Sequence, residues 1–171
     1  GLDDEVDLQH LRERLLVEMR DIFAELALTV IYVTHDQDEA FALADELVVM
    51  RRGVAVRQGP PEELWHDPGD VFTARFLGHD NVLSADEAAE AASRGLPIDG
   101  PALVPSDAVR LEPSDDGAGV VVASTLRDGR RRTEVRLGTL RLVAVDTDAA
   151  VRVGGAVAVT IATERIVPLA P

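Results

Sequence analysis

The chain has 171 residues, of which 46% are hydrophobic and 28% charged, a composition typical of one globular domain or two small ones. It contains no cysteine, which excludes disulfides, thiolate metal sites and a cysteine nucleophile and favours a reducing compartment. The net charge of -14 argues against nucleic acid as a partner, because phosphate backbones bind basic surfaces. All 17 basic residues are arginine, so the lysine of a phosphate-binding glycine loop is missing and any nucleotide site here is incomplete.

The N-terminal part of the chain predicts a helix followed by a buried strand. Apolar residues recur at helical spacing, the pattern of a long amphipathic helix: Leu8, Leu11, Leu15, Met19, Ile22, Phe23 and Leu26. Residues 28–34 then form a nearly continuous apolar, β-branched run, which is typical of a strand buried on both faces in a parallel sheet. A helix followed by such a strand indicates an α/β fold. No apolar run reaches the ~20 residues needed to span a bilayer.

His35 follows directly after the predicted strand. Asp36 and Glu39 are spaced as an N-cap residue and its N3 partner, so a short helix is expected to begin there. In open α/β sheets, ligands bind at the carboxyl ends of strands, beside helix N-termini that favour anions. His35 is therefore a candidate site residue, although an isolated histidine at such a position more often caps or packs.

The next elements are expected to complete a first domain of residues 1–79. Residues 47–50 and 54–58, joined by a turn at residues 51–53, predict a β-hairpin. Pro61, followed by two glutamates, suits the first turn of a helix. A further short helix is predicted from Asp70 to Leu77, where Gly78 ends it.

Residues 80–171 predict a second, smaller domain rich in strands. An alanine-rich stretch at residues 86–94 suggests one short helix. Turn residues then recur between short apolar segments, which is typical of a small antiparallel barrel or sandwich. The apolar alternation changes phase across Gly138 and Thr139, so a turn or bulge is expected there.

The first domain resembles the ATPases of ABC transporters. Residues 33–40, Val-Thr-His-Asp-Gln-Asp-Glu-Ala, resemble the switch-histidine region of that family. Residues 47–50, 58–59, 61–64 and 72–78 follow the family's order and spacing, and Gly1-Leu2-Asp3 resembles the end of its D-loop. The resemblance implies that residues 1–79 form the C-terminal part of a RecA-like P-loop ATPase core, starting just downstream of the catalytic carboxylate.

The second domain is similar to the TOBE-type, OB-fold-like regulatory domain of import ATPases. Residues 104–111 are similar to its Arg-Pro-Glu-Asp segment, from which Val104 and Ser106 depart, and residues 157–161 are similar to its closing strand. The resemblance implies an α/β part followed by a small all-β, OB-like barrel.

The resemblance also implies a function for the parent subunit: ATP hydrolysis coupled to uptake of a solute of the ferric iron, oxyanion, thiamine, polyamine or sugar class. It gives His35 a catalytic role, in contact with the γ-phosphate and the attacking water. It makes His35 and Asp3 nucleotide-binding residues, Asp3 acting across the interface of two ATPase subunits. The cofactors are ATP and Mg2+, most of whose contacts lie upstream, and no metal ligand is assigned within this chain. The fragment alone is not expected to hydrolyse ATP.

The implied partners are a second copy of the ATPase subunit, the transmembrane permease subunits and, indirectly, a solute-binding protein; nucleic acid is not among them. The implied location is peripheral, on the cytoplasmic face of the cell membrane.

The alternative is a stand-alone regulatory or dimerisation module without an ATPase role. That alternative predicts a hydrophobic core that is complete without upstream sequence, whereas the flanks of a parallel strand at residues 28–34 require neighbours.

Other conspicuous residues have plainer interpretations. The acids between Asp3 and Asp7 suit the start of a helix, and Trp65 is expected to pack its helix on the hairpin. Four arginines are expected to form a solvated hairpin tip rather than an anion site: Arg127, Arg130, Arg131 and Arg132. The remaining histidines, at positions 10, 66 and 79, are expected on the surface and do not form a metal-binding set.

Overall fold

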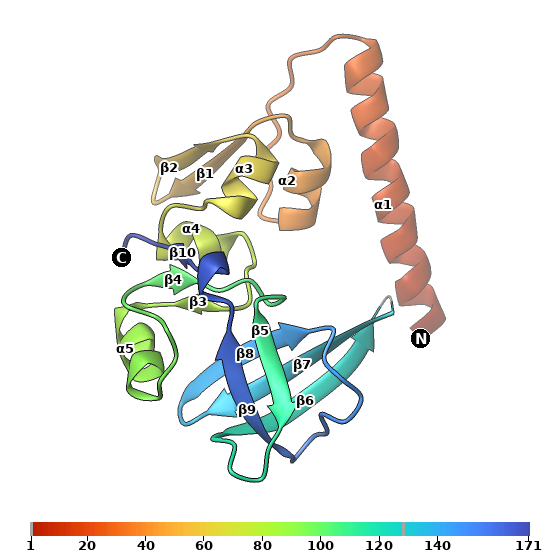
Figure 1. Cartoon of the computed structure of the whole chain (residues 1–171). Helices are drawn as coiled ribbons and strands as arrows, with labels where there is room; N and C mark the ends of the chain where they lie inside the picture. The colour runs from red at the N-terminus through yellow and green to blue at the C-terminus, as the bar shows by residue number, and fades with distance from the viewer. Residues whose placement is uncertain (1, 128) are drawn as a thin grey trace. The chain divides into compact units, whose positions relative to one another are not determined.

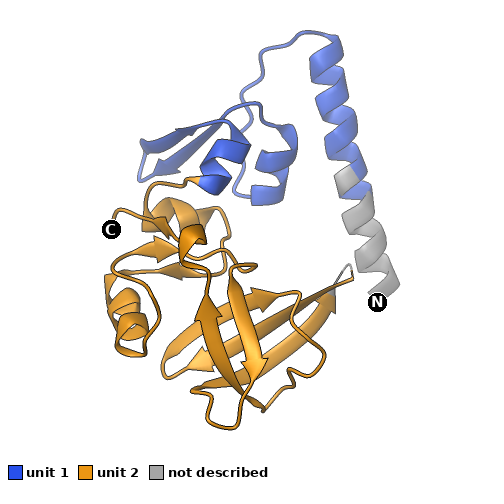
Figure 2. Ribbon diagram, in the orientation of Figure 1, with its two compact units in different colours: residues 1–66 blue, residues 67–171 orange. Residues whose placement is uncertain are grey.

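The computed structural model describes the backbone of residues 2–127 and 129–171, and the side chains of residues 11, 12, 14–126 and 129–171. It divides into two compact units, residues 1–66 and residues 67–171 (Figure 2). No helix in the described part is both long and apolar enough to cross a membrane.

The first unit contains three helices and one hairpin among its described residues (Figure 1). In chain order these elements are α1 (Leu2–Glu25), α2 (Gln37–Leu43), β1 (Leu47–Arg51), β2 (Val54–Gly59) and α3 (Pro61–His66). The predicted N-terminal helix and hairpin are thus confirmed. Arg52 and Gly53 both have positive φ, at 51° and 80°, the backbone that a tight two-residue hairpin turn requires.

The first unit has few buried apolar side chains. Among its described residues, Leu16, Val49 and Leu64 are the buried ones. Trp65 packs as expected, but its ring meets Phe41 of α2 edge to face, with ring centroids 5.6 Å apart. Aromatic pairs favour this arrangement, which joins α3 to α2.

The predicted strand at residues 28–34 is wrong for this chain. The segment has no hydrogen-bonded neighbour that would make it a strand, and it runs exposed between α1 and α2. The side chains of Ile31 and Val33 are each 91% exposed. An apolar, β-branched run indicates burial between neighbouring strands, and the described residues provide none beside it.

Among its described residues, the second unit contains two antiparallel sheets, two short α-helices and one turn of 3-10 helix, Thr163–Arg165 (Figure 1). The helices are α4 (Val71–Phe76) and α5 (Ala85–Ser93). The smaller sheet has the order β10-β4-β3, and the larger sheet the order β5-β9-β6-β7-β8. The strands are β3 (Val82–Leu83), β4 (Ala102–Leu103), β5 (Val109–Pro113), β6 (Gly119–Arg127), β7 (Arg130–Leu137), β8 (Leu140–Val145), β9 (Ala156–Ile161) and β10 (Val167–Pro168).

The larger sheet is not a closed barrel, which corrects the barrel expected from the sequence. Its end strands, β5 and β8, are not paired with each other. The N–H of Val145 donates to the carbonyl of Ser106 just before β5, but the chain then turns away at Asp146, whose φ is 56°. A closed barrel would require a continuous ladder of backbone hydrogen bonds between the two edge strands, β5 and β8.

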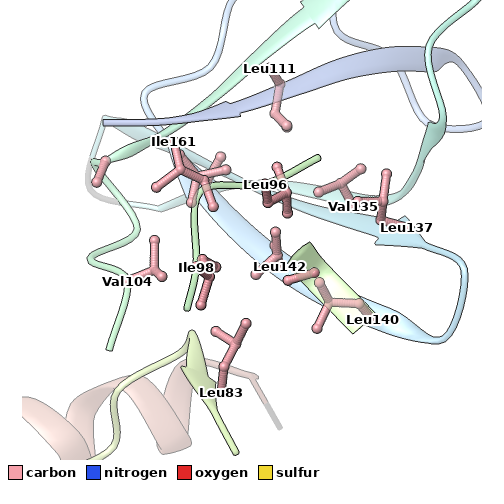
Figure 3. Packing of buried hydrophobic residues seen from close by; sticks show 14 of the residues in the cluster. Leu83, Leu96, Ile98, Val104, Leu111, Val135, Leu137, Leu140, Leu142 and Ile161 are labelled. Carbon is pink, nitrogen blue, oxygen red and sulfur yellow. The ribbon is translucent and has the colours of Figure 1, made fainter. Parts of the chain in front are cut away.

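The core of the second unit lies between the larger sheet, α5 and the loops beside it (Figure 3). Leu142, Val135 and Ile98 are almost completely buried there. The predicted change of phase is confirmed, because Gly138, with a φ of 68°, turns the chain between β7 and β8. As a result Leu137 and Leu140, on either side of the turn, both enter the core.

The helix α4 belongs to the second unit, although the sequence placed it at the end of a first domain of residues 1–79. Ala74 packs with Val82, Leu103 and Leu169 in a small apolar cluster. The N–H of Val71 donates to the carbonyl of Ala170 at 3.0 Å. These contacts reach the last residues of the chain, so the compact unit begins at Asp67.

Replacing Gly117 by alanine is expected to lower the free energy of unfolding of the second unit by about 1–3 kcal/mol. A Cβ at this position would overlap the backbone carbonyl group of Val157 in β9, and backbone atoms cannot rotate away. Gly100→Ala is the matched control, because nothing lies within 4 Å of its Cβ position. Urea denaturation followed by circular dichroism measures both variants, and equal stability would contradict the close approach of β9.

Candidate functional site

The candidate site is the turn that carries His35 into α2. Asp36 has an extended backbone and caps the helix, because its Oδ1 accepts a hydrogen bond from the N–H of Glu39 at 3.1 Å. The N–H of Ala40 donates to the carbonyl of Asp36 at 3.2 Å, which begins the helical ladder. The predicted N-cap is therefore confirmed. His35 is the residue before the N-cap, and its side chain is exposed.

Glu39 does not have the role that its position at N3 predicts. In a capping box its carboxylate would accept the N–H of the N-cap residue. Here the N–H of Asp36 donates instead to Oγ1 of Thr34 at 3.0 Å. The hydroxyl of Thr34 donates to Oε2 of Glu39 at 2.6 Å, and the hydroxyl of Tyr32 donates to the same oxygen at 3.1 Å. Glu39 thus fastens the segment that leads into His35.

Arg12 of α1 binds the same turn from outside. Its Nη2 donates to Oδ2 of Asp36 at 2.6 Å and to Oε1 of Glu39 at 2.7 Å. Two turns further along α1, Arg20 contacts the other end of α2. Its Nη1 lies 3.4 Å from the carbonyl oxygen of Ala42, and its Nη2 lies 3.8 Å from a carboxylate oxygen of Asp45. The two arginines therefore connect α1 to both ends of α2.

These contacts shift the acidity of the side chains around the turn. The hydrogen bond from Arg12 lowers the pKa of Asp36 below its ordinary value. The pKa of Glu39 is lowered first by the hydroxyl of Thr34 and then by Arg12. The carboxylate of Glu39 in turn raises the pKa of Tyr32. Hydrogen bonds to an ionised carboxylate favour that form, so the turn holds two carboxylates and a neutral phenol at neutral pH.

The other predicted site residue, Asp3, lies outside the residues whose side chains are described, as does His10. His66 ends α3 and is exposed, while His79 follows α4 in the second unit. Within the described part of the chain, no group of three or more histidine or carboxylate side chains could hold a metal ion.

Sequence reasoning missed the contacts of Arg12, Tyr32 and Thr34. Arg12 and Asp36 are 24 positions apart in the sequence, so no local pattern pairs them. One signal was present: Arg12 and Arg20 lie eight positions apart, which places them on one face of a helix. That face is the one that meets α2.

The surface beside the turn is apolar. Large hydrophobic side chains are exposed on α1, on residues 26–33 and on the hairpin: Leu11, Leu15, Val17, Ile22, Leu26, Leu28, Val30, Ile31, Val33, Val48, Met50, Val54 and Val56. Exposed apolar surface of this extent marks a region that another surface covers. The described residues of the first unit therefore do not form the complete core that a stand-alone module requires.

No model of a known protein family matches the chain, but curated proteins do. It is 50% identical over 124 residues to the Fe(3+) ions import ATP-binding protein FbpC of Streptomyces avermitilis, a match covering 67% of this chain and 36% of the relative. It is 48% identical over 128 residues to the protein of the same name from Streptomyces coelicolor, covering 68% of this chain and 37% of the relative. It is 43% identical over 75 residues to the spermidine/putrescine import ATP-binding protein PotA of Vibrio vulnificus, covering 44% of this chain and 20% of the relative. The chain thus spans little more than a third of the length of its most extensively matched relatives.

Proposed function

Because this chain is a homologue of part of the ATP-binding subunits of ABC import systems, we propose that it works within such a subunit, in which ATP hydrolysis drives solute uptake. The observation that best supports this proposal is the structure of the turn at His35. Its imidazole is exposed, so a ligand can reach it. The capped helix α2 and the bonds of Glu39 fix the backbone on both sides of it.

The role of His35 follows from the chemistry of phosphoryl transfer. That reaction needs positioning and charge stabilisation more than covalent catalysis by the protein. An imidazole held on a fixed turn can donate a hydrogen bond to the γ-phosphate and orient the attacking water. In this proposal Asp3 lies near the nucleotide of the second subunit.

The chain supplies only a minor part of the nucleotide site. It has no lysine, and its described residues have no cluster of metal ligands. The phosphate loop and the contacts to Mg2+ are therefore assigned to residues outside this chain. The residues that the structure describes do not fit a magnesium site.

The second unit is proposed to be the TOBE-type regulatory part and to contact a second copy of the subunit. The permease subunits would hold the assembly at the cytoplasmic face of the membrane. The relatives matched over about two thirds of this chain are named for Fe(3+) import, and those named for spermidine and putrescine match 44% of it. This difference favours ferric iron as the solute of the system.

The full-length subunit is expected to bind ATP with micromolar affinity, and the 171-residue chain only weakly or not at all. One phosphate-contacting histidine cannot replace a phosphate loop, whose backbone N–H groups and lysine supply most of the ground-state contacts. Titration calorimetry on both preparations, together with a hydrolysis assay of the subunit, tests the proposal.

A full-length subunit that does not hydrolyse ATP would contradict the proposed function. Micromolar binding by the 171-residue chain alone would contradict the division of the site between this chain and upstream residues.

A further inference from the structure

One guanidinium nitrogen holds both carboxylates of the turn that carries His35. The Nη2 atom of Arg12 donates to Asp36 at 2.6 Å and to Glu39 at 2.7 Å. Resting on the proposed function above, we propose that Arg12 is a positioning residue that sets the orientation of His35 toward the phosphate. Arg12 acts through the two carboxylates and does not touch the nucleotide.

The oxygen atoms of the two carboxylates are divided between Arg12 and the turn. Asp36 uses Oδ2 for Arg12 and Oδ1 for the N–H of Glu39. Glu39 uses Oε1 for Arg12, and its Oε2 accepts the hydroxyls of Thr34 and Tyr32. Asp36 thus links Arg12 to the backbone after His35, and Glu39 links it to the side chains of Thr34 and Tyr32 before His35. Losing Arg12 removes one of the bonds that orient each carboxylate, so the turn is held less firmly.

The expected effect is on rate rather than on stability. The side chain of Arg12 is 48% exposed, and those of Asp36 and Glu39 are 28% and 20% exposed. Ion pairs this open to solvent contribute little to global stability. A small misplacement of a group that acts in the transition state, in contrast, can lower turnover by up to about a hundredfold. We expect Arg12→Met to lower kcat about tenfold, with KM for ATP within about twofold and an unchanged melting temperature.

Arg20→Met is the matched control. Arg20 lies on the same helix and joins α1 to the far end of α2, away from His35. If the arginines merely hold α1 against α2, the two variants should behave alike. If Arg12 positions the turn, Arg20→Met should keep nearly full turnover.

Arg12→Lys is the conservative variant. Since a single nitrogen of Arg12 makes both bonds, an ammonium group could replace it, although the lysine side chain is shorter. Partial recovery of kcat is therefore expected. Recovery by lysine would show that turnover depends on the positive charge next to the two carboxylates, rather than on the packing of the arginine side chain.

The experiment measures kcat and KM for ATP of the full-length subunit in all four forms, with hydrogen exchange of the amides of Asp36 and Glu39 in the same preparations. Arg12→Met should combine lower kcat with faster exchange of these two amides. The inference is overturned if Arg12→Met keeps the wild-type kcat, if its exchange is unchanged, or if Arg20→Met loses as much activity. A wild-type subunit without ATPase activity would instead overturn the proposed function, so the two failures are distinguishable.

Discussion

Replacement of His35 by alanine in the full-length subunit is expected to lower ATP turnover by about a hundredfold or more while leaving ATP affinity nearly unchanged. Removing one preorganised contact to a transition state typically costs that much in kcat. In the proposed subunit, ground-state affinity depends mainly on a phosphate loop outside this chain, which this substitution leaves intact. A variant that loses kcat at constant affinity has lost an interaction made in the transition state.

The measurement is ATP affinity by calorimetry and steady-state hydrolysis on one preparation, with a thermal melt to check folding. His66→Ala is the matched control, because His66 is also an exposed histidine of the first unit but ends α3, away from the turn. Near wild-type hydrolysis by His35→Ala would remove His35 from the mechanism. Equal losses of affinity and rate would make it a binding residue.

Local signals predicted the turn at His35, and non-local contacts escaped prediction. The N-cap at Asp36 depends on residues within four positions of each other, a range over which sequence patterns are informative. The partners of Glu39 could not be predicted in this way, because Arg12 lies 27 positions away. The capping pattern even suggested a different bond for Glu39, since Thr34 competes for the N–H of Asp36.

The same distinction explains the errors in the fold. The run at residues 28–34 predicts burial between neighbouring strands, but the described residues supply no such neighbours and the segment is exposed. The alternation in β7 and β8 predicted their turn, because register is local to a hairpin. Pairing of β5 with β8 depends on the path of the chain after Val145. That path turns away at Asp146, whose positive φ cannot be predicted from the alternation of apolar residues. The packing of α4 on Leu169 likewise joins segments that are distant in sequence.

Asn81→Ala is expected to have the largest effect on stability of any change described. Asn81 is only 2% exposed, and its amide joins the chain before β3 to β8. Nδ2 donates to the carbonyls of Val104 at 3.1 Å and Val143 at 2.8 Å, and Oδ1 accepts from the N–H of Val143 at 2.6 Å. Alanine would leave three buried backbone groups without these partners, at about 1–3 kcal/mol each. A total loss of about 3–9 kcal/mol is comparable with the whole stability of a small domain.

Urea denaturation of the chain, followed by circular dichroism, measures this loss, and Asp80→Ala is the matched control. Asp80 is the preceding residue, but its bonds to Arg132 and Ser106 are exposed, so its removal should cost no more than about 1 kcal/mol. Asn81→Asp provides a second variant: it keeps an acceptor for Val143 but turns a carboxylate toward two carbonyls. Its folded-state pKa should be raised, so relative to wild type it should regain stability as the pH falls through that value, when the carboxyl can donate one bond. If Asn81→Ala proves as stable as Asp80→Ala, the amide does not hold the two segments together, and the apolar core around Leu142 must account for their packing.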